Sequence, residues 1–215
     1  MVRLYCLLIG YVFGLFQTAY IIGKLHGIDI RNYGSGNSGT TNMMRTLGKK
    51  AGFATFAGDC LKCIAAVMLT RALFRSSYGD ILPLLSFYTA AGVILGHNYP
   101  FYLGFRGGKG IASTAGLVIS LQPLMTALGI ITFFSTVLIT KYVSLGSILV
   151  YVGIMIELPI LGQLGYFGME QKYLNEMYLV AFLLALLAFW RHRENISRLL
   201  AGTERKTYLL GKKDK

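Results

Sequence analysis

A polar, glycine-rich segment at residues 29–45, called here the first polar segment, holds the residue types and spacing best suited to chemistry. It reads D-I-R-N-Y-G-S-G-N-S-G-T-T-N-M-M-R and lies between two strongly apolar runs. Its glycines permit positive φ and bring amide N–H groups close to a ligand, while its short hydroxyl and amide side chains add donors and acceptors. Arg31 and Arg45 flank it with permanent positive charge. This combination is typical of a cradle for phosphate.

The second polar segment, residues 96–110, reads G-H-N-Y-P-F-Y-L-G-F-R-G-G-K-G. It places Lys109 between glycines just before a predicted helix at residues 111–121, where free N–H groups and the helix dipole favour an anion. It is not a Walker A loop, because the G-x-x-x-x-G-K-[ST] spacing is absent. The alternative interpretation is a tight turn at the membrane interface, with Lys109 extended toward the headgroups. His97 is expected to form hydrogen bonds at a helix end rather than to act as a catalyst.

The third polar segment, residues 190–200, reads W-R-H-R-E-N-I-S-R-L-L. His192 and Asn195 lie three residues apart and would share one face of a helix. A basic helix that contacts anionic lipid is the alternative, but a histidine and an asparagine among arginines favour a site. Function is expected where the three polar segments meet. The tail from residue 203 is expected to be interfacial or frayed.

The composition is that of a membrane protein rather than of a soluble domain. Of the 215 residues, 54% are hydrophobic and 14% are charged. Apolar runs near the ~20 residues needed to cross a bilayer recur, and they do not alternate as β spans do. The sequence therefore predicts an all-α, polytopic integral membrane protein, embedded in the lipid bilayer as a single domain over residues 1–215. Its first run is too long for the h-region of a signal peptide and is interpreted as an uncleaved helix.

About seven transmembrane helices are expected. Their predicted spans are residues 4–23, 52–73, 81–95, 111–121, 124–139, 142–158 and 176–190. The fourth must be short or tilted, because its length falls below that of a full crossing. Pro123 marks a turn before the fifth. If residues 111–139 instead form one kinked helix, the number falls to six.

The basic residues alternate between two sets of loops. One set carries Lys24, Arg31, Arg45, Lys49, Lys50, Arg106, Lys109, Lys141 and the cluster at residues 191–215. The other carries Arg3, Arg71, Arg75 and Lys172, among Asp80, Glu157, Glu170 and Glu176. The positive-inside rule then predicts that the N-terminus is outside and the C-terminus cytoplasmic. All three polar segments would face the cytoplasm.

Several classes of function are excluded by what the chain lacks. The net charge of +12 does not indicate nucleic-acid binding, because the basic residues lie in loops and at the C-terminus without a basic helix or an aromatic RNA-binding stripe. The nine acidic residues are scattered, so neither a metal site nor a cofactor is predicted. There is also no G-x-S-x-G nucleophile elbow.

Two charged residues and two cysteines lie inside the apolar run at residues 52–73. Asp59 and Lys62 share a helix face, and an ion pair that locks helices together is favoured over a direct role with substrate. Cys60 and Cys63 form C-x-x-C, which within an apolar helix indicates small buried side chains rather than a redox or metal site.

Together the polar segments resemble those of the bacterial acyl-phosphate:glycerol-3-phosphate acyltransferases, the PlsY family. The family pattern G-S-G-N-x-G-A-T-N is matched by G-S-G-N-S-G-T-T-N at residues 34–42, and G-H-x-[FY]-P…F-K-G-G-K-G is matched at residues 96–110. R-H-x-x-N-I-x-R-L-x-x-G-x-E is matched at residues 191–204, and R-Y-x-S-L-x-S-I more weakly from residue 141. The resemblance covers nearly the whole chain in order.

The resemblance implies transfer of a fatty acyl group from acyl phosphate to the 1-hydroxyl of glycerol 3-phosphate, giving lysophosphatidic acid and phosphate, the first acylation of phospholipid synthesis. It implies seven helices and a cytoplasmic active site in the bacterial plasma membrane. By motif position it assigns catalysis to Ser35, Arg45, Lys109, His192 and Asn195. It assigns substrate or phosphate binding to Gly34, Gly36, Asn37, Gly39, Thr41, Asn42, Gly107, Gly108, Gly110, His97 and Ser144. The protein is expected to be a monomer.

Two positions depart from the family pattern, since Thr40 replaces an alanine and Arg106 replaces a lysine. These departures bear on the expected fine substrate preference and leave the expected reaction class unchanged. Acyl phosphate is already activated, so direct transfer without a metal or a covalent acyl-enzyme is expected, and the base is left open between His192 and the substrate's own phosphate. The alternatives are a carrier for an anionic phosphorylated metabolite and a lipid-binding scaffold. A carrier opens to both sides, whereas the polar segments are predicted on one.

Overall fold

The computed structural model describes residues 1–208, which form helices joined by turns. The α-helices of this range are α1 (Val2–Gly14), α2 (Thr18–Leu25), α3 (Thr40–Leu47), α4 (Lys49–Tyr78), α5 (Leu82–Asn98), α6 (Ile111–Leu121), α7 (Pro123–Thr140), α8 (Val143–Gln163), α9 (Gln171–Arg191) and α10 (Arg193–Leu200). Short 3-10 helices lie at Ile30–Asn32, Gly79–Ile81 and Phe101–Leu103. The all-α prediction is confirmed for this part of the chain.

Several of these helical stretches are long and apolar enough to cross a membrane. They are Val2–Leu25, Lys49–Leu103, Pro123–Thr140, Val143–Gln163 and Gln171–Arg191. The second of these stretches is 55 residues long and contains both α4 and α5. Helix α6 is a shorter apolar helix. A multi-pass architecture follows, while the count of seven spans and the orientation of the termini stay predictions.

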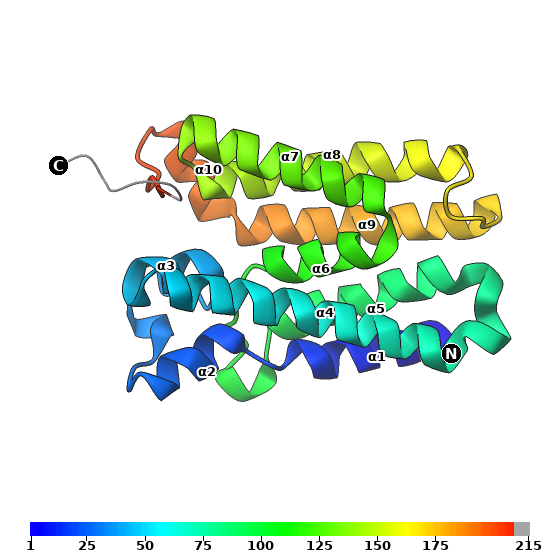
Figure 1. The fold of residues 1–215 in the computed structure, drawn as a ribbon, viewed down its shortest axis with the longest axis horizontal. Coiled ribbons are helices and arrows are strands. Elements are labelled where there is room, and N and C mark those ends of the chain that lie inside the picture. The colour runs from blue at the N-terminus through cyan, green and yellow to red at the C-terminus, as the bar shows by residue number, and fades with distance from the viewer. Residues whose placement is uncertain (209–215) are drawn as a thin grey trace.

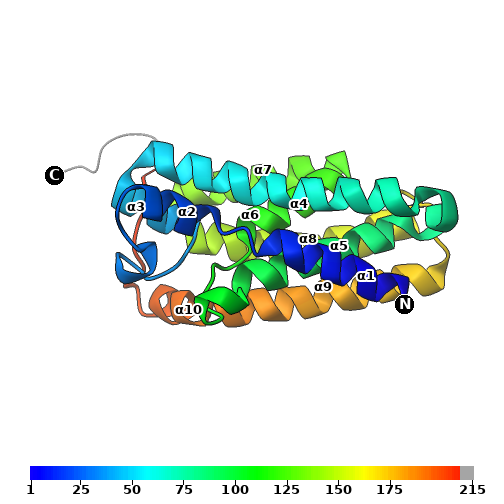
Figure 2. The ribbon, with the colours of Figure 1, turned by 90° about the horizontal axis from the view of Figure 1, so that it is seen from below.

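The axes of the long helices are roughly parallel to one another, and the helices pack as two groups (Figures 1 and 2). In Figure 1, α1, α4 and α5 lie on one side of α6, and α7, α8 and α9 lie on the other. Helices α1 and α5 approach most closely at glycines: a Cβ on Gly10 would lie 1.9 Å from the carbonyl oxygen of Thr89, and one on Gly92 would lie 2.1 Å from that of Leu7. Such small residues allow backbones to touch inside a membrane.

The first apolar run is a candidate membrane span over Val2–Leu25, as predicted for residues 4–23, but the expectation that it forms one helix is wrong. Helix α1 ends at Gly14, and α2 begins at Thr18 after a break in which Gln17 has φ −100° and ψ 87°. The side-chain amide of Gln17, fully buried, donates to the carbonyl oxygens of Gly14 (3.0 Å), Gly96 (3.3 Å) and His97 (3.1 Å). Gln17 therefore links the break between α1 and α2 to the C-terminal end of α5 by hydrogen bonds.

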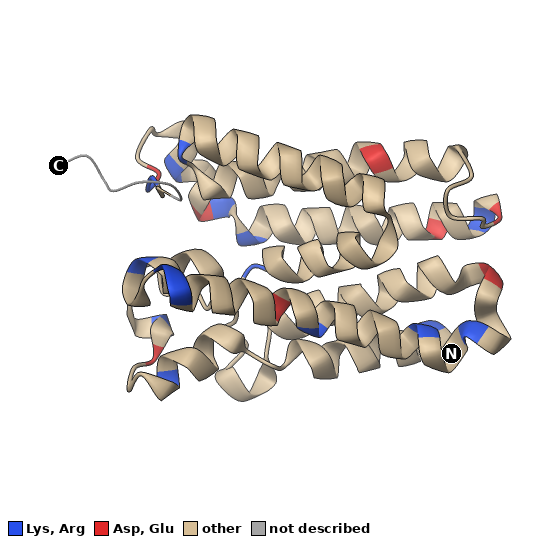
Figure 3. Ribbon diagram, in the orientation of Figure 1, with Lys and Arg blue, Asp and Glu red and all other residues tan. Residues whose placement is uncertain are grey.

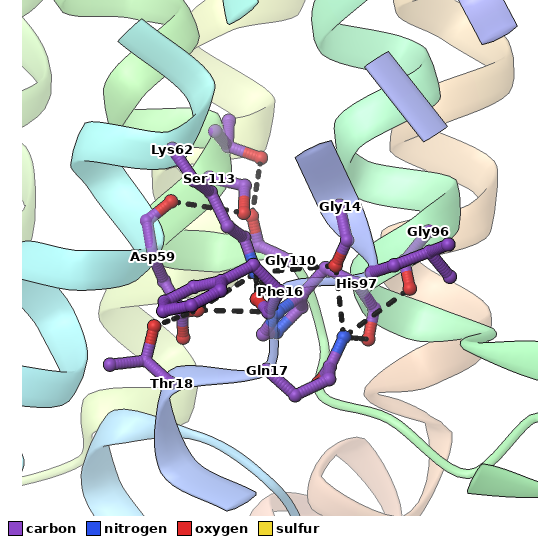
Figure 4. A network of polar contacts seen from close by, with 12 residues as sticks. Gly14, Phe16, Gln17, Thr18, Asp59, Lys62, Gly96, His97, Gly110 and Ser113 are labelled. Carbon is purple, nitrogen blue, oxygen red and sulfur yellow. Dashed lines mark hydrogen bonds and ion pairs between the residues drawn. The ribbon is translucent and has the colours of Figure 1, made fainter. Parts of the chain in front are cut away.

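A buried lysine explains why the break forms (Figure 4). Lys62 Nζ donates to the carbonyl oxygen of Phe16 (2.7 Å), to Asp59 Oδ1 (2.8 Å) and toward His97 Nδ1 (2.9 Å). Thr18 also donates to Asp59 Oδ1, at 3.0 Å. A charge inside a membrane must be paired or hydrogen-bonded, and a broken helix frees the carbonyl that Lys62 needs. The predicted helix-locking ion pair of Asp59 and Lys62 is confirmed.

Helices α6 and α7 are separate, so the alternative of one kinked helix over residues 111–139 is wrong. Gln122 between them is extended, with φ −155° and ψ 123°, and its side chain accepts from the backbone N–H of Leu124 at 3.1 Å. Pro123 opens α7, as its fixed φ allows. The chain reverses there, so that α7 runs back alongside α6 (Figure 1).

Most of the basic residues lie at one end of the bundle, the end that holds α3 and α10 (Figures 1 and 3). All three polar segments lie toward this end, called here the polar end. The opposite end holds the N-terminus, the turn between α4 and α5 and the loop between α8 and α9. The fold thus places the three polar segments on one side, as the loop charges predicted.

Candidate active site

Asn42 holds the first polar segment in shape. It is 2% exposed; its amide donates to the carbonyl oxygens of Ile30 (3.2 Å) and Tyr33 (2.9 Å), and its Oδ1 accepts from the backbone N–H of Ser35 (2.9 Å). Gly34 has φ 60°, and a Cβ there would lie 2.2 Å from Asn42 Oδ1, so this position requires glycine. Asn42 is thus the internal brace of the loop that presents the exposed Ser35.

The same segment continues into the start of α3. Gly36 is exposed with φ 69°, and Gly39 is the residue that precedes α3. Asn37 folds over that position, because its Oδ1 lies 2.8 Å from where a Cβ on Gly39 would stand. Thr41, in the first turn of α3, is half-buried. Backbone amides at this helix start are oriented as an anion site requires.

Arg31 joins the first polar segment to the second. Its guanidinium donates to the carbonyl oxygen of Leu103 at 3.0 Å and forms an ion pair with Asp29 at 2.7 Å. The hydrogen bonds from Arg31 lower the pKa of Asp29 to about 2. Arg31 therefore holds the first and second polar segments together, and its charge is already paired with that of Asp29.

The glycine turn of the second segment packs directly on the end of α5. The backbone N–H groups of Gly107 and Gly108 donate to the carbonyl oxygens of Asn98 and His97, both at 3.1 Å. A Cβ on Gly107 would lie 1.9 Å from the carbonyl oxygen of His97, and one on Gly108 would lie 2.1 Å from His97 Nε2. Gly110 precedes α6 with φ 80°. No larger residue fits without moving this turn.

Arg191 clamps the turn from the other side. Its Nη2 donates to the carbonyl oxygens of Gly107 (3.1 Å) and Gly108 (2.7 Å), and its guanidinium stacks on Tyr99 with 5.2 Å to the ring centroid. His97 lies beneath the turn and is 3% exposed. With Nδ1 toward Lys62 and Nε2 against Gly108, His97 links the buried ion pair to the glycine turn.

Lys109 reaches the third segment. Its Nζ donates to Asn195 Oδ1, and the amide of Asn195 donates to Glu204 Oε1 at 2.7 Å. Glu204 also accepts from Ser144 Oγ (2.8 Å) and Arg198 Nε (2.7 Å). The structure thus brings Lys109, Asn195 and Ser144, which lie far apart in the sequence, into one cluster.

The electrostatics of this cluster favour an additional anion. Burial, and then the charge of Arg198, lower the pKa of Lys109 to about 8. Burial alone would raise the pKa of Glu204, but hydrogen bonds from Asn195, Arg198 and Ser144 outweigh it and lower that pKa. Glu204 therefore stays ionised, and its single negative charge faces the positive charges of Lys109 and Arg198.

His192 lies at the junction of α9 and α10 and is 3% exposed. Its Nδ1 is 2.8 Å from the carbonyl oxygen of Ala188. Because a carbonyl only accepts, Nδ1 carries the proton and Nε2 keeps its lone pair. Burial, and then the charge of Lys109, lower the pKa of His192 to about 4. The ring is neutral at pH 7 and able to accept a proton at Nε2.

The chain after α10 folds back over the polar end. Of the two expectations for the tail from residue 203, interfacial or frayed, the frayed one is wrong for residues 203–207, and residues 209–215 lie outside the described part of the chain. Glu204 and Thr207 are both buried. The guanidinium of Arg45 donates to the carbonyl oxygen of Arg205 (3.0 Å) and to Thr207 Oγ1 (2.6 Å), and the N–H of Thr207 donates to the carbonyl oxygen of Lys141 (2.8 Å). This segment, residues 202–207, is called here the C-terminal strap, and it ties Arg45 to the cluster.

A shallow groove opens beside His192 between α8 and α9. It is a surface depression lined by Ile148, Tyr151, Ala188, Phe189 and His192. Apart from His192 and the Tyr151 hydroxyl, which pairs with Thr114 Oγ1 at 2.6 Å, the lining is apolar. Within residues 1–208, no group of three or more His, Cys, Asp or Glu side chains could hold a metal ion.

The comparison with known families decides the identity. The family model described as glycerol-3-phosphate acyltransferase matches residues 4–202. The chain belongs to this acyltransferase family. Similar members include glycerol-3-phosphate acyltransferases of Clostridioides difficile (strain 630), 44% identical with 92% of each chain covered, and of Shouchella clausii (strain KSM-K16), 42% identical with 96% of this chain and 95% of the relative covered.

Solved structures agree with that family assignment. The fold resembles the crystal structure of PlsY (YgiH), an integral membrane glycerol 3-phosphate acyltransferase, in its glycerol 3-phosphate form, with a TM-score of 0.83 and 33% identity over 97% of this chain and 96% of that one. The lysophosphatidic acid form gives a TM-score of 0.80. The resemblance inferred from the polar segments is therefore confirmed at the level of the family.

Three residues of the candidate site were not assigned from their residue types and spacing. Glu204 orders Ser144, Asn195 and Arg198, yet by sequence it is one charged residue in a polar tail. Arg191 and Arg198 looked like two members of a basic stripe. The family pattern over residues 191–204 was the available signal, since it begins at Arg191 and ends at Glu204.

Proposed function

We propose that this protein transfers a fatty acyl group from acyl phosphate to the 1-hydroxyl of glycerol 3-phosphate, giving lysophosphatidic acid and inorganic phosphate. One observation carries the proposal. Lys109 stands at the start of α6, hydrogen-bonded to Asn195. Around it, the three positive charges of Lys109, Arg191 and Arg198 exceed the two negative charges of Glu194 and Glu204. Both substrates of this reaction carry a phosphate, and such a site has unused positive charge to offer.

The chain's own residues suit the tasks of direct transfer. The backbone amides at the start of α3 suit phosphate oxygens, and Ser35 is presented beside them. Lys109, with the N-terminus of α6, suits the negative charge that develops as the reaction proceeds. The apolar groove between α8 and α9 ends at His192 and suits the acyl chain.

The step balances without another reactant. The 1-hydroxyl oxygen of glycerol 3-phosphate bonds to the acyl carbonyl carbon, the bond from that carbon to the phosphate oxygen breaks, and phosphate leaves. The hydroxyl proton passes either to His192 Nε2 or to the phosphate that departs. A pKa of about 4 makes the free imidazole a weak base, so we favour the phosphate as the final acceptor of the proton.

The remaining features of the proposal follow from the fold and the charge pattern. The polar end faces the cytoplasm and the protein lies in the bacterial plasma membrane, because the basic loops gather at that end. All the residues named for the site come from one chain, so a monomer suffices. Transfer needs no divalent metal and no covalent acyl-enzyme.

The test is direct assay of the purified protein in detergent. Palmitoyl phosphate and glycerol 3-phosphate should yield lysophosphatidic acid and phosphate in equal amounts, whereas palmitoyl-coenzyme A should not replace the donor. Arg193→Ala is a matched control, because Arg193 is exposed and stacks on Trp190 beside the site, and its activity should stay near that of the wild type. Transfer from palmitoyl-coenzyme A at an equal rate would refute the proposed donor.

A further inference from the structure

A second cavity lies at the end of the bundle opposite the acyltransferase site. It encloses about 420 Å³ and is lined by Arg71, Arg75, Gly79, Asp80, Leu82, Pro83, Phe167 and Gly168. These residues come from α4, from the turn that joins α4 to α5, from the start of α5 and from the loop between α8 and α9. Those elements meet at the right-hand end of Figure 1, away from α3 and α10.

The basic residues of this end fall into two kinds. Arg3 forms an ion pair with Glu176, and Lys172 forms one with Glu170. Arg71 and Arg75 have no ion pair with any carboxylate in the described part of the chain. The two unpaired arginines are the two that line the cavity.

The arginines are placed together by the helix that carries them. They lie four residues apart in α4 and so project from one face, one turn apart. Arg71 is partly fixed, since its Nε donates to Ser86 Oγ (3.1 Å) and its Nη2 donates to the carbonyl oxygen of Ser120 (2.6 Å). Both partners are neutral, so the charge of Arg71 is still without a counter-ion.

We propose that this cavity binds the phosphate group of a glycerophospholipid from the leaflet opposite the acyltransferase site. An unpaired arginine in a membrane helix is costly unless an anion meets it, and phosphate is the anion that arginine binds with two parallel hydrogen bonds. With Arg71, Arg75 and Asp80, the lining carries one net positive charge. Leu82, Pro83 and Phe167 give the cavity an apolar wall, which suits acyl chains and disfavours a free phosphate ion. Asp80 can accept a hydrogen bond from a headgroup hydroxyl.

Binding of dioctanoyl-phosphatidylglycerol tests this assignment. Delipidated protein in detergent is titrated with this lipid and with dioctanoylglycerol, which has the same chains and no phosphate, and bound lipid is counted by native mass spectrometry. The phosphatidyl lipid should bind and dioctanoylglycerol should not. Arg71→Gln and Arg75→Gln should each weaken binding by about tenfold or more, the loss expected for a charge-assisted contact. Arg75 is exposed, so its replacement tests binding without endangering the fold.

Two control variants separate this cavity from other lipid contacts. Lys172→Gln removes a paired charge at the same end and should leave the affinity unchanged. Lys109→Ala alters the acyltransferase site and should also leave it unchanged, so this test is independent of the proposed reaction. Equal affinity in the wild type and both arginine variants would overturn the proposal. Displacement of the lipid by inorganic phosphate at an equal concentration would overturn the assignment to a phospholipid.

Discussion

Lys109 is the residue whose replacement tests the active site most sharply. Its Nζ donates to Asn195 and stands beside the N-terminus of α6. If it holds a phosphate oxygen in the transition state, Lys109→Ala removes a charge-assisted contact of ~1.5–3 kcal/mol. At ~1.4 kcal/mol for each factor of ten, kcat/KM should fall by about 10- to 150-fold. Stability should change little, since the side chain lies in a polar turn and its loss leaves no apolar cavity.

The same residue predicts a pH dependence. Its pKa is lowered from 10.5 to about 8, so the free enzyme loses this charge as the pH rises through about 8, and kcat/KM should fall there. A bound phosphate raises the pKa again, so kcat should fall only at higher pH. Between pH 8 and 10.5 the unfolded chain holds more protons at this position than the folded protein. This group therefore makes stability rise with pH in that window.

The assay is lysophosphatidic acid formation by purified variants across neutral and alkaline pH. Lys109→Arg keeps its charge throughout, so any activity it retains should lack the alkaline fall. Its wider guanidinium should not restore full activity in so close a glycine turn. Lys50→Ala, an exposed lysine at the start of α4, is the matched control. The reasoning is refuted if Lys109→Ala keeps half its activity with unchanged stability, or if wild type and Lys109→Arg show the same alkaline fall.

Three other predictions concern the strap, the metal and the topology. Glu204→Gln should weaken the hydrogen bonds from Asn195, Ser144 and Arg198, loosen the C-terminal strap and speed tryptic cleavage after Arg205; an unchanged cleavage rate would count against this role. Activity should survive exhaustive EDTA treatment, and a loss that Mg²⁺ restores would contradict metal-free transfer. Impermeant thiol reagents added outside intact cells should label Tyr166→Cys and miss Thr203→Cys, with little background because Cys6, Cys60 and Cys63 are buried. The reverse labelling pattern would invert the proposed orientation.

The fold could be predicted wherever its signals were local. The expected helix at residues 111–121 coincides with α6, because Gly110 and Pro123 mark its two boundaries in the sequence itself. The break after Gly14 could not be predicted from its neighbours. It depends on Lys62, whose ammonium needs the carbonyl of Phe16 and comes from a helix 46 positions away. A hydropathy profile cannot show such a long-range hydrogen bond.

Some residues of the candidate site could also be predicted from the sequence, and others could not. Glycines beside Lys109, and a histidine with an asparagine three residues later, are patterns that indicate chemistry without a structure. Asn42 sits in the predicted cradle, but its task of bracing the loop is visible only from its contacts with Ile30 and Tyr33. The role of Glu204 depends on its hydrogen bonds with Ser144 of α8 and Asn195 of α10. These partners come together only in the folded chain, so the residue type alone does not indicate the role of Glu204.

The C-terminal strap is also the last part of the polar end to be synthesised. Arg45 and Thr207 are 162 positions apart, and their contact completes the polar end. At the ~5–20 residues per second of ribosomal synthesis, about 8 to 32 seconds separate the two residues. Within that interval α3 is made first, the glycine turn follows, and Glu204, whose carboxylate orders Asn195, comes near the end. A chain that stops before residue 204 would therefore hold the helices of the bundle without the C-terminal strap over the candidate site.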